Sequence, residues 1–195
     1  MHAFNINTLL VACLLLLTFS SNALAETIIS NADLKEARLL VKTFGGELKL
    51  ELETAMRTGG PAKALEVCHL QAGPIAKKLS LSSGWSVGRT SLKVRNIDNK
   101  PDEWEAMTLL QFEKRKAAGE DVKKLEHSEI VKVDDKMVLR YMKTIPTAGL
   151  CISCHGSRLS EDVSKKVTLL YPYDQATGFN IGDIRGAFSL QKNLK

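Results

Sequence analysis

Cys151-Ile152-Ser153-Cys154-His155 is the stretch around which the chain is organised. Two thiols separated by two residues can each form a thioether with one vinyl group of a porphyrin, and the histidine directly after them then lies beneath the iron. Gly156 follows, so no side chain crowds the backbone at this turn. The spacing predicts one covalent c-type haem, attached through Cys151 and Cys154, with His155 as the proximal iron ligand.

Three other kinds of site also use Cys-x-x-Cys: a zinc site, a redox-active dithiol and a structural disulfide. None of them requires a histidine immediately after the second cysteine, so the motif favours haem. One metal alternative stays open at this stage. Cys68, Cys151, Cys154 and His155 together would make a Cys₃His zinc set.

The amino terminus indicates export. Residues 1–25 contain no Lys, Arg, Asp or Glu, carry an apolar run over 9–19 and end in Ala23-Leu24-Ala25, a small-x-small cleavage site. The run is short for a membrane span, which makes a retained anchor the alternative. We therefore expect a secretory signal peptide over 1–25, cleaved after Ala25, and a mature protein in the periplasm, where c-type haem is attached.

Length and charge limit what the remaining residues 26–195 can be. They are enough for one domain with a hydrophobic core. The chain has 27 Lys plus Arg against 22 Asp plus Glu, and this net charge of +5 is spread without a basic block. The pattern argues against nucleic acid as a partner.

The cysteine count leaves one thiol over, because Cys13 falls in the predicted signal peptide and two more are assigned to haem. This thiol, Cys68, shares one helical face with Leu65, Ile75 and Leu79, which indicates an inward position, either as a small core residue or as the sixth iron ligand. His69 falls at the margin of the same face. The alternatives to Cys68 as sixth ligand are His69, Met107, His127 and Met142.

Hydrophobic periodicity predicts an α+β domain with an antiparallel sheet and a long amphipathic helix at its start. That helix begins near Ser30 and ends at Thr58-Gly59-Gly60-Pro61, and Pro74 suggests a bend or break in the next one. We expect the haem between the sheet and its flanking helices. The later elements are a second helix over 61–79, a strand over 85–95, a helix from Pro101, strands over 129–133 and 137–142 joined across 134–136, a helix from 160 to Pro172 and a strand over 183–190.

Four arginines are candidates to bind the haem propionates, because a guanidinium group matches a carboxylate with two parallel hydrogen bonds. They are Arg89, Arg95, Arg140 and Arg185. Arg185 can instead pair with Asp183, two residues away on the same strand face.

Several stretches in this order resemble a known family of exported c-type haem domains with a PAS-like fold, catalogued as a domain of unknown function. Its members are stand-alone cytochromes and the sensory parts of membrane histidine kinases and chemoreceptors. The resemblance implies a PAS-like fold, with His155 on one side of the iron and Cys68 on the other; His69 beside Cys68 keeps a His69/His155 pair open. The stretches are ALEVCHLQAGPIA (64–76), VGRTSLKVRN (87–96), NKPDEWE (99–105), CISCHG (151–156) and YPYDQATGFNIGDIRGAFSL (171–190).

Two classes of function follow. The first is a haem redox module, either a low-potential electron carrier with a redox partner protein or a sensor of redox state, NO or CO that acts through a membrane kinase. A thiolate ligand stabilises ferric iron, which suits both roles. The second is a haem enzyme of the peroxidase or nitrite reductase type, but a filled sixth position leaves no substrate site, so we expect no enzyme activity.

Overall fold

The computed structural model describes residues 28–194; the predicted signal peptide at 1–25 and Cys13 lie outside them. None of the helices in this described part is long and apolar enough to cross a membrane. The elements are α1 (Asn31–Ser83), β1 (Ser86–Thr90), η1 (Ile97–Asn99), α2 (Glu103–Ala117), η2 (Val122–Lys124), β2 (Glu126–Val133), β3 (Lys136–Pro146), η3 (Gly149–Cys151), α3 (Ile152–His155), α4 (Glu161–Leu170) and β4 (Ile184–Asn193).

The four strands form one antiparallel sheet in the order β1-β4-β3-β2. β2 and β3 are joined by the two residues Asp134 and Asp135, both with positive φ (46° and 62°), as a type I′ hairpin turn requires. The α+β class, the hairpin and the long N-terminal helix are confirmed. The PAS-like assignment is compatible with this sheet and stays a prediction.

α1 is two helices joined at Gly60, whose φ of 71° and ψ of −168° are not helical. The predicted end of the first helix at 58–61 is therefore confirmed. Of the bend or break predicted at Pro74, the break is wrong, because helical backbone angles continue through it to Ser83. Pro74 is exposed, while Ile75 and Leu79 beyond it are buried in the core, so packing holds the helix together there.

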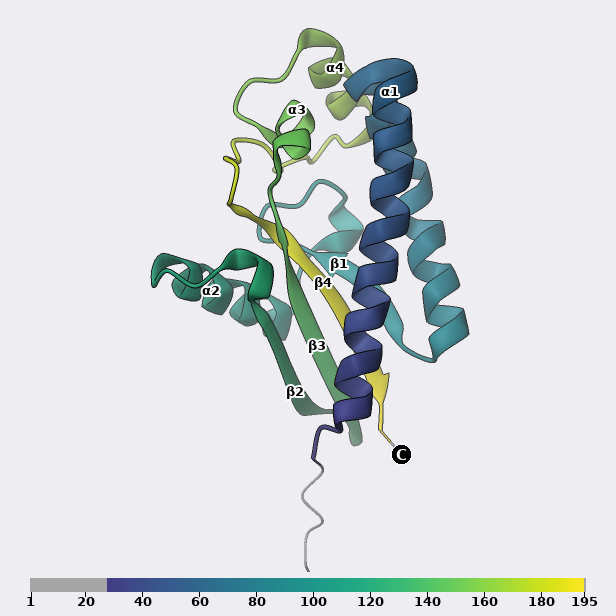
Figure 1. Cartoon of the computed structure of the whole chain (residues 1–195), viewed down its shortest axis with the longest axis vertical. Helices are drawn as coiled ribbons and strands as arrows, with labels where there is room; N and C mark the ends of the chain where they lie inside the picture. The colour runs from purple at the N-terminus through teal and green to yellow at the C-terminus, as the bar shows by residue number, and fades with distance from the viewer. Residues whose placement is uncertain (1–27, 195) are drawn as a thin grey trace, which may run out of the picture.

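The two faces of the sheet are covered by different helices (Figure 1). The first part of α1 packs on one face through Val41 and Phe44, against Tyr141 and Leu190 of the strands. α2 covers the other face in a second apolar cluster, which contains Leu109, Phe112, Met142 and Ala187. Burial on both faces fixes which side of each strand points to which helix.

The third cluster lies beyond the sheet, where α4 packs on the second part of α1 through Leu65, Val163, Val167 and Tyr171. The chain enters this end of the molecule from β3 and passes through α3 and α4 before it returns as β4 (Figure 1). The predicted strand over 85–95 stops at Thr90, and residues 91–95 also turn into this end. The Cys-x-x-Cys-His motif therefore lies at the end of the sheet, not between a sheet face and a helix.

Candidate functional site

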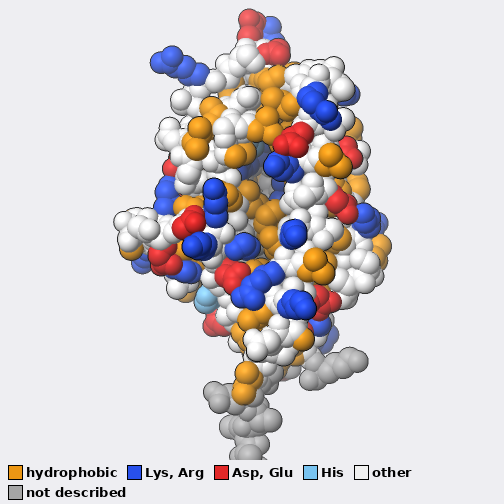
Figure 2. Space-filling view, in the orientation of Figure 1, with side chains coloured by type: hydrophobic (Ala, Val, Ile, Leu, Met, Phe, Trp, Pro, Cys, Tyr) orange, Lys and Arg blue, Asp and Glu red, His pale blue; other side chains and the backbone are white. Residues whose placement is uncertain are grey.

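The motif and the leftover thiol come together from distant parts of the chain. η3 and α3 carry Cys151, Cys154 and His155 towards the second part of α1, where the Cys154 thiol lies 3.8 Å from the carbonyl oxygen of Pro61. Cys68, about two turns further along α1, is close enough to Cys151 and Cys154 for their charges to influence one another. Figure 2 shows the surface hollowed between α1 and the neighbouring segments just below α3, with Lys and Arg side chains at its rim.

The His155 ring is held by one backbone segment. Its Nδ1 lies 2.8 Å from the carbonyl oxygen of Ala176, and the backbone of the same segment bonds to His155 and Gly156 through the amides of Phe179 (3.0 Å) and Gly178 (3.1 Å). A carbonyl oxygen can only accept, so this contact favours the tautomer with the proton on Nδ1 and the electron pair on Nε2. This tautomer and a ring held by a backbone carbonyl are typical of a metal-binding histidine.

His155 is also neutral. Burial lowers its pKa to about 2, and the positive charges of Arg185, Arg95 and Arg89 act in the same direction. A neutral imidazole is the form that binds a metal, so no proton has to leave before Nε2 can act as a ligand.

Gly156 confirms the expectation that no side chain fits after the motif. A Cβ at this position would lie 2.7 Å from the carbonyl oxygen of Ile152 and 2.8 Å from its Cγ2. Both distances are shorter than van der Waals contact, so any other residue would push α3 out of place.

Cys68 is half-buried and its neighbour His69 is exposed, with the His69 ring edge-on to Tyr171 at 5.1 Å between centroids. Burial raises the pKa of the Cys68 thiol, and the charges of Arg89 and Arg95 oppose this rise. Burial likewise raises the pKa of Cys154. Of the adjacent pair on α1, Cys68 is thus the residue that faces the motif.

Arg95 links the segments around the motif and is buried. Its guanidinium forms an ion pair with Asp174 at 2.9 Å and donates to the carbonyl oxygens of Cys154 (2.7 Å) and Ala176 (3.2 Å). Its Nη1 is buried with no partner among the described residues. Arg95 therefore joins the Cys-x-x-Cys-His motif to the segment that holds His155, and its Nη1 keeps two spare N–H donors.

Arg89 and Arg185 lie at the same end without a carboxylate partner among residues 28–194. Arg89 lies over the Phe44 ring at 5.5 Å, and burial lowers its pKa. Arg185 lies against His155, with its Nε 3.1 Å from Nδ1 and 3.4 Å from Nε2, and donates to Ser91 Oγ at 3.2 Å. Burial and the charges of Arg95 and Arg89 lower the pKa of Arg185 to about 10. The site therefore has an excess of positive charge.

Two predictions about arginines are wrong. Arg140 points to the α2 face of the sheet, because alternate residues of a strand face opposite sides. There it pairs with Asp102 at 2.7 Å and lies over the Trp104 ring at 4.4 Å. Arg185 does not pair with Asp183, whose carboxylate binds Lys116 at 2.7 Å.

The other candidates for the sixth ligand lie away from the motif. Met142 is fully buried under α2 and Met107 is exposed on α2. His127, on β2, packs beside Trp104 of α2. Among the described residues no three His, Cys, Asp or Glu side chains form a metal-binding group. The Cys₃His zinc alternative thus finds no support, whereas one thiol and one imidazole on opposite sides of a cofactor need no such cluster.

Sequence reasoning missed Asp174, Ala176 and Ser91, which hold the arginines and His155 in place. Asp174 is 79 residues from Arg95, and the carbonyl of Ala176 acts through its backbone, which side-chain identity does not reveal. The only signal was that all three residues lie inside the resemblance stretches at 87–96 and 171–190.

The comparisons with known proteins agree with this architecture. The sequence model of the Tll0287-like family matches residues 20–192. A solved structure described as the cyanobacterial haem protein Tll0287 superposes with a TM-score of 0.60 at 23% sequence identity, covering 86% of this chain and 98% of the other. A search of curated proteins gave no match.

Proposed function

The chain belongs to the Tll0287-like family, and we propose that it is a periplasmic c-type cytochrome that binds one haem. Cys151 and Cys154 would attach the porphyrin through thioethers, and His155 Nε2 and the Cys68 thiolate would hold its iron. The bound haem supplies one-electron redox chemistry. The protein acts as a sensor of redox state or of NO or CO, or as a low-potential electron carrier, and not as an enzyme.

The observation that carries the proposal is the pairing of a preoriented neutral imidazole with an inward-facing thiol. His155 is held at Nδ1 by Ala176, which leaves Nε2 for iron, and Cys68 faces the motif from α1. The described solved structure with this fold is itself called a haem protein, which supports haem as the cofactor here.

The chemistry of the ligands supports a low reduction potential. A thiolate is an anionic donor that favours ferric over ferrous iron, and ligation requires Cys68 to lose a proton that burial otherwise favours. The neighbouring positive charges of Arg89 and Arg95 favour the anion. A sensor would lose this bond on reduction or when a gas binds, whereas a carrier would keep it.

The test is covalent attachment. Expressed with the cytochrome c maturation machinery, the protein should begin at Glu26 and carry one haem that resists extraction with acidic acetone. The Cys151→Ser/Cys154→Ser double variant should lose all haem to extraction, while Cys68→Ala keeps it, because Cys68 forms no thioether. Extractable haem, or none, in the wild type would refute the proposal.

A further inference from the structure

The end of the molecule that carries the motif holds three guanidinium groups and one paired carboxylate. Arg95 forms an ion pair with Asp174. Neither Arg89 nor Arg185 has an acidic partner among residues 28–194. Half-buried cations without counter-charges cost stability, since desolvation is not offset by an ion pair. Lys93 Nζ lies over the Phe179 ring at 4.7 Å and adds to this positive charge. The surplus indicates that the site takes an anionic group.

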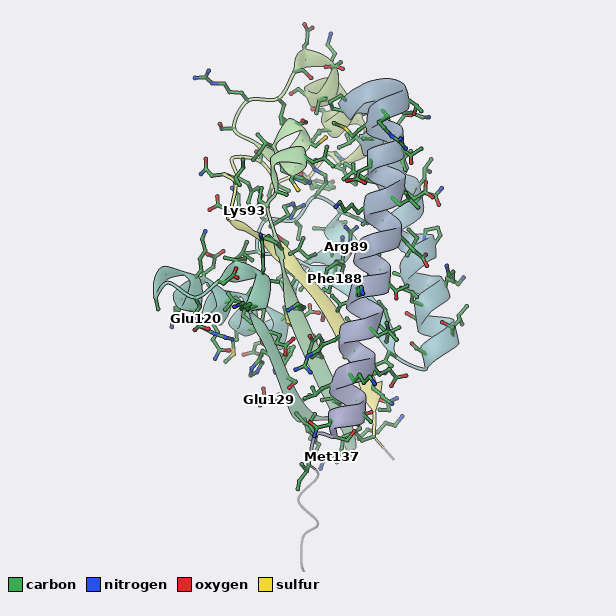
Figure 3. The ribbon with its side chains drawn as sticks, in the orientation of Figure 1. Arg89, Lys93, Glu120, Glu129, Met137 and Phe188 are labelled. Carbon is green, nitrogen blue, oxygen red and sulfur yellow. The ribbon has the colours of Figure 1, made fainter. Side chains whose placement is uncertain are left out.

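The two unpaired guanidinium groups are held in defined positions. Arg185 lies over the Phe179 ring at 5.3 Å and donates through Nη1 to Ser91 Oγ and to the Lys93 carbonyl oxygen at 3.3 Å. Arg89 lies over Phe44 from β1. In Figure 3 Arg89 and Phe188 lie between α1 and the strands. Each group keeps free N–H donors, because a guanidinium carries five and the neighbours take only some of them.

Both groups flank the ligands of the proposed haem. Arg185 contacts the His155 ring, and Arg89 is near enough to Cys68 for its charge to act on the thiol. They therefore approach the same cofactor from the His155 side and from the Cys68 side. The two carboxylates that a haem carries are its propionates, and guanidinium binds carboxylate through two parallel hydrogen bonds.

We propose that Arg89 and Arg185 bind the two haem propionates, whereas Arg95 is a positioning residue that joins Cys154 to the segment holding His155. This assignment rests on the proposed function. It narrows the sequence-based set of four arginines, because Arg95 and Arg140 leave it. Arg140 already has Asp102 and Glu105 as partners on the opposite face of the sheet.

The test compares two porphyrins in the full chain produced without the maturation machinery. Ferric mesoporphyrin IX has ethyl groups in place of vinyl groups, so it forms no thioethers, and its dimethyl ester lacks both negative charges. The wild type should bind the diacid at least about 10-fold more tightly than the diester, because two charge-assisted pairs are lost in the ester. The Arg89→Gln/Arg185→Gln double variant should bind both with the same affinity.

Matched variants separate the assignment from a general effect of charge. Arg158→Gln removes the same charge from an exposed position three residues after His155, and it should keep the preference for the diacid. Arg185→Lys keeps the charge but loses the two-point geometry, so it should keep part of the preference. Circular dichroism of each variant checks that the fold is retained.

The outcomes distinguish this inference from the proposed function. Equal affinity of the wild type for diacid and diester, with covalent haem retained after maturation, would overturn the propionate assignment and leave haem binding intact. A wild type that binds neither porphyrin and carries no covalent haem would refute both. In the matured protein, Arg89→Gln and Arg185→Gln should lower the midpoint potential and Arg158→Gln should not, because a positive charge beside the haem favours ferrous iron; no change in either variant would count against the assignment.

Discussion

The sheet and the motif end of the molecule differ in how their charged side chains are paired. On the sheet, Glu126 binds Arg38 at 2.5 Å and accepts a hydrogen bond from Tyr141 at 2.7 Å on the α1 face, and buried Arg140 pairs with Asp102 on the α2 face. At the motif end, Arg89 and Arg185 have no carboxylate partner in the described part of the chain. The first arrangement offsets the charges within the protein itself, and the second leaves two guanidinium groups for the ligand that we propose.

This difference tells which residues to test for folding and which for binding. Variants of the paired charges on the sheet should change the free energy of unfolding and leave the haem properties unchanged. Variants at the motif end should change the haem properties with a smaller effect on folding. The residues between these two regions, where β1 and β4 meet, should affect both.

The largest effect on stability should come from this junction. Gly186 has a φ of 158°, and a Cβ there would clash with the carbonyl oxygen of Thr90 and lie 3.1 Å from Ser91 Cβ. Gly186→Ala should therefore lower the free energy of unfolding by about 3 kcal/mol, because β1 and β4 must separate. Urea denaturation of the haem-free chain measures this.

Gly46→Ala is the matched control, since nothing lies within 4 Å of its added Cβ on exposed α1. It should raise the stability by up to about 1 kcal/mol through helix propensity. Equal effects of the two substitutions would show that the contact with Thr90 does not constrain the junction.

The next effect concerns Cys68 at the motif end. Cys68→Met exchanges an anionic donor for a neutral thioether, which favours ferrous iron, so the midpoint potential of the matured protein should rise by at least on the order of 100 mV, or about 2.4 kcal/mol. The thiolate-to-iron charge-transfer bands of the ferric spectrum should disappear as well. Redox titration and absorption spectroscopy measure the two changes.

His69→Ala is the control for the neighbouring residue, because His69 is exposed and packs on Tyr171. It should keep the bands and the potential. The reverse result, bands kept in Cys68→Met and lost in His69→Ala, would move the sixth ligand one residue along α1.

How far the sequence predicts this molecule depends on whether the signal is local. The motif spacing, the helix start at Ser30 and the turn at Asp134-Asp135 are local patterns, and the structure has a helix or turn at each place. The propionate role predicted for Arg140 was wrong, and the role of Arg185 was left open. Both depend on which face of the sheet a strand residue points to and on the bulge near Pro146. A few residues of sequence encode neither the face nor the bulge.

Pro74 and Arg95 illustrate the same limit from the side of packing. Proline disfavours a helix interior, yet Ile75 and Leu79 bury the following turns and keep the helix intact. Arg95 was expected to face the haem from a strand, but the strand ends at Thr90 because Ser91 Oγ bonds to the carbonyl oxygens of Lys93 and Arg185. Long-range contacts decided both positions.

A smaller effect, on the sheet, is the acid sensitivity of Glu126. Its pKa falls from 4.5 to about 2, mainly because Arg38 donates a hydrogen bond to it. The hydrogen bond from Tyr141 and the charge of Lys143 act in the same direction. A group with a lowered pKa stabilises the fold above its unfolded pKa and loses this contribution as the pH falls towards the folded pKa. Glu126→Gln should therefore cost on the order of 2 kcal/mol at pH 7 and remove part of the loss of stability between about pH 4.5 and pH 2.

Glu53→Gln provides the comparison, since Glu53 forms an exposed pair with Lys49 at 3.6 Å. It should cost less than about 0.5 kcal/mol at any pH. The haem spectrum should be the same in both variants. A changed spectrum in Glu126→Gln would mean that the sheet and the motif end are coupled and would weaken the contrast between them.

The smallest effect tests α1, which joins the sheet to the motif end, because Cys68 lies towards the motif and Leu79 lies in the core of the sheet. Pro74→Ala restores a backbone N–H to a helix that is already continuous, on an exposed face where no cavity forms, so the free energy of unfolding should rise by about 1 kcal/mol.

Pro61→Ala should have the opposite sign, a loss of about 0.5 to 1 kcal/mol, because Pro61 opens the second helix after Gly60, where its fixed φ is favourable. Denaturation of both variants and redox titration of the matured Pro74→Ala protein measure this. If Pro74→Ala gains stability and keeps its midpoint potential, packing alone sets the position of Cys68. If the midpoint potential changes, Pro74 itself positions Cys68, and α1 couples the sheet to the motif end.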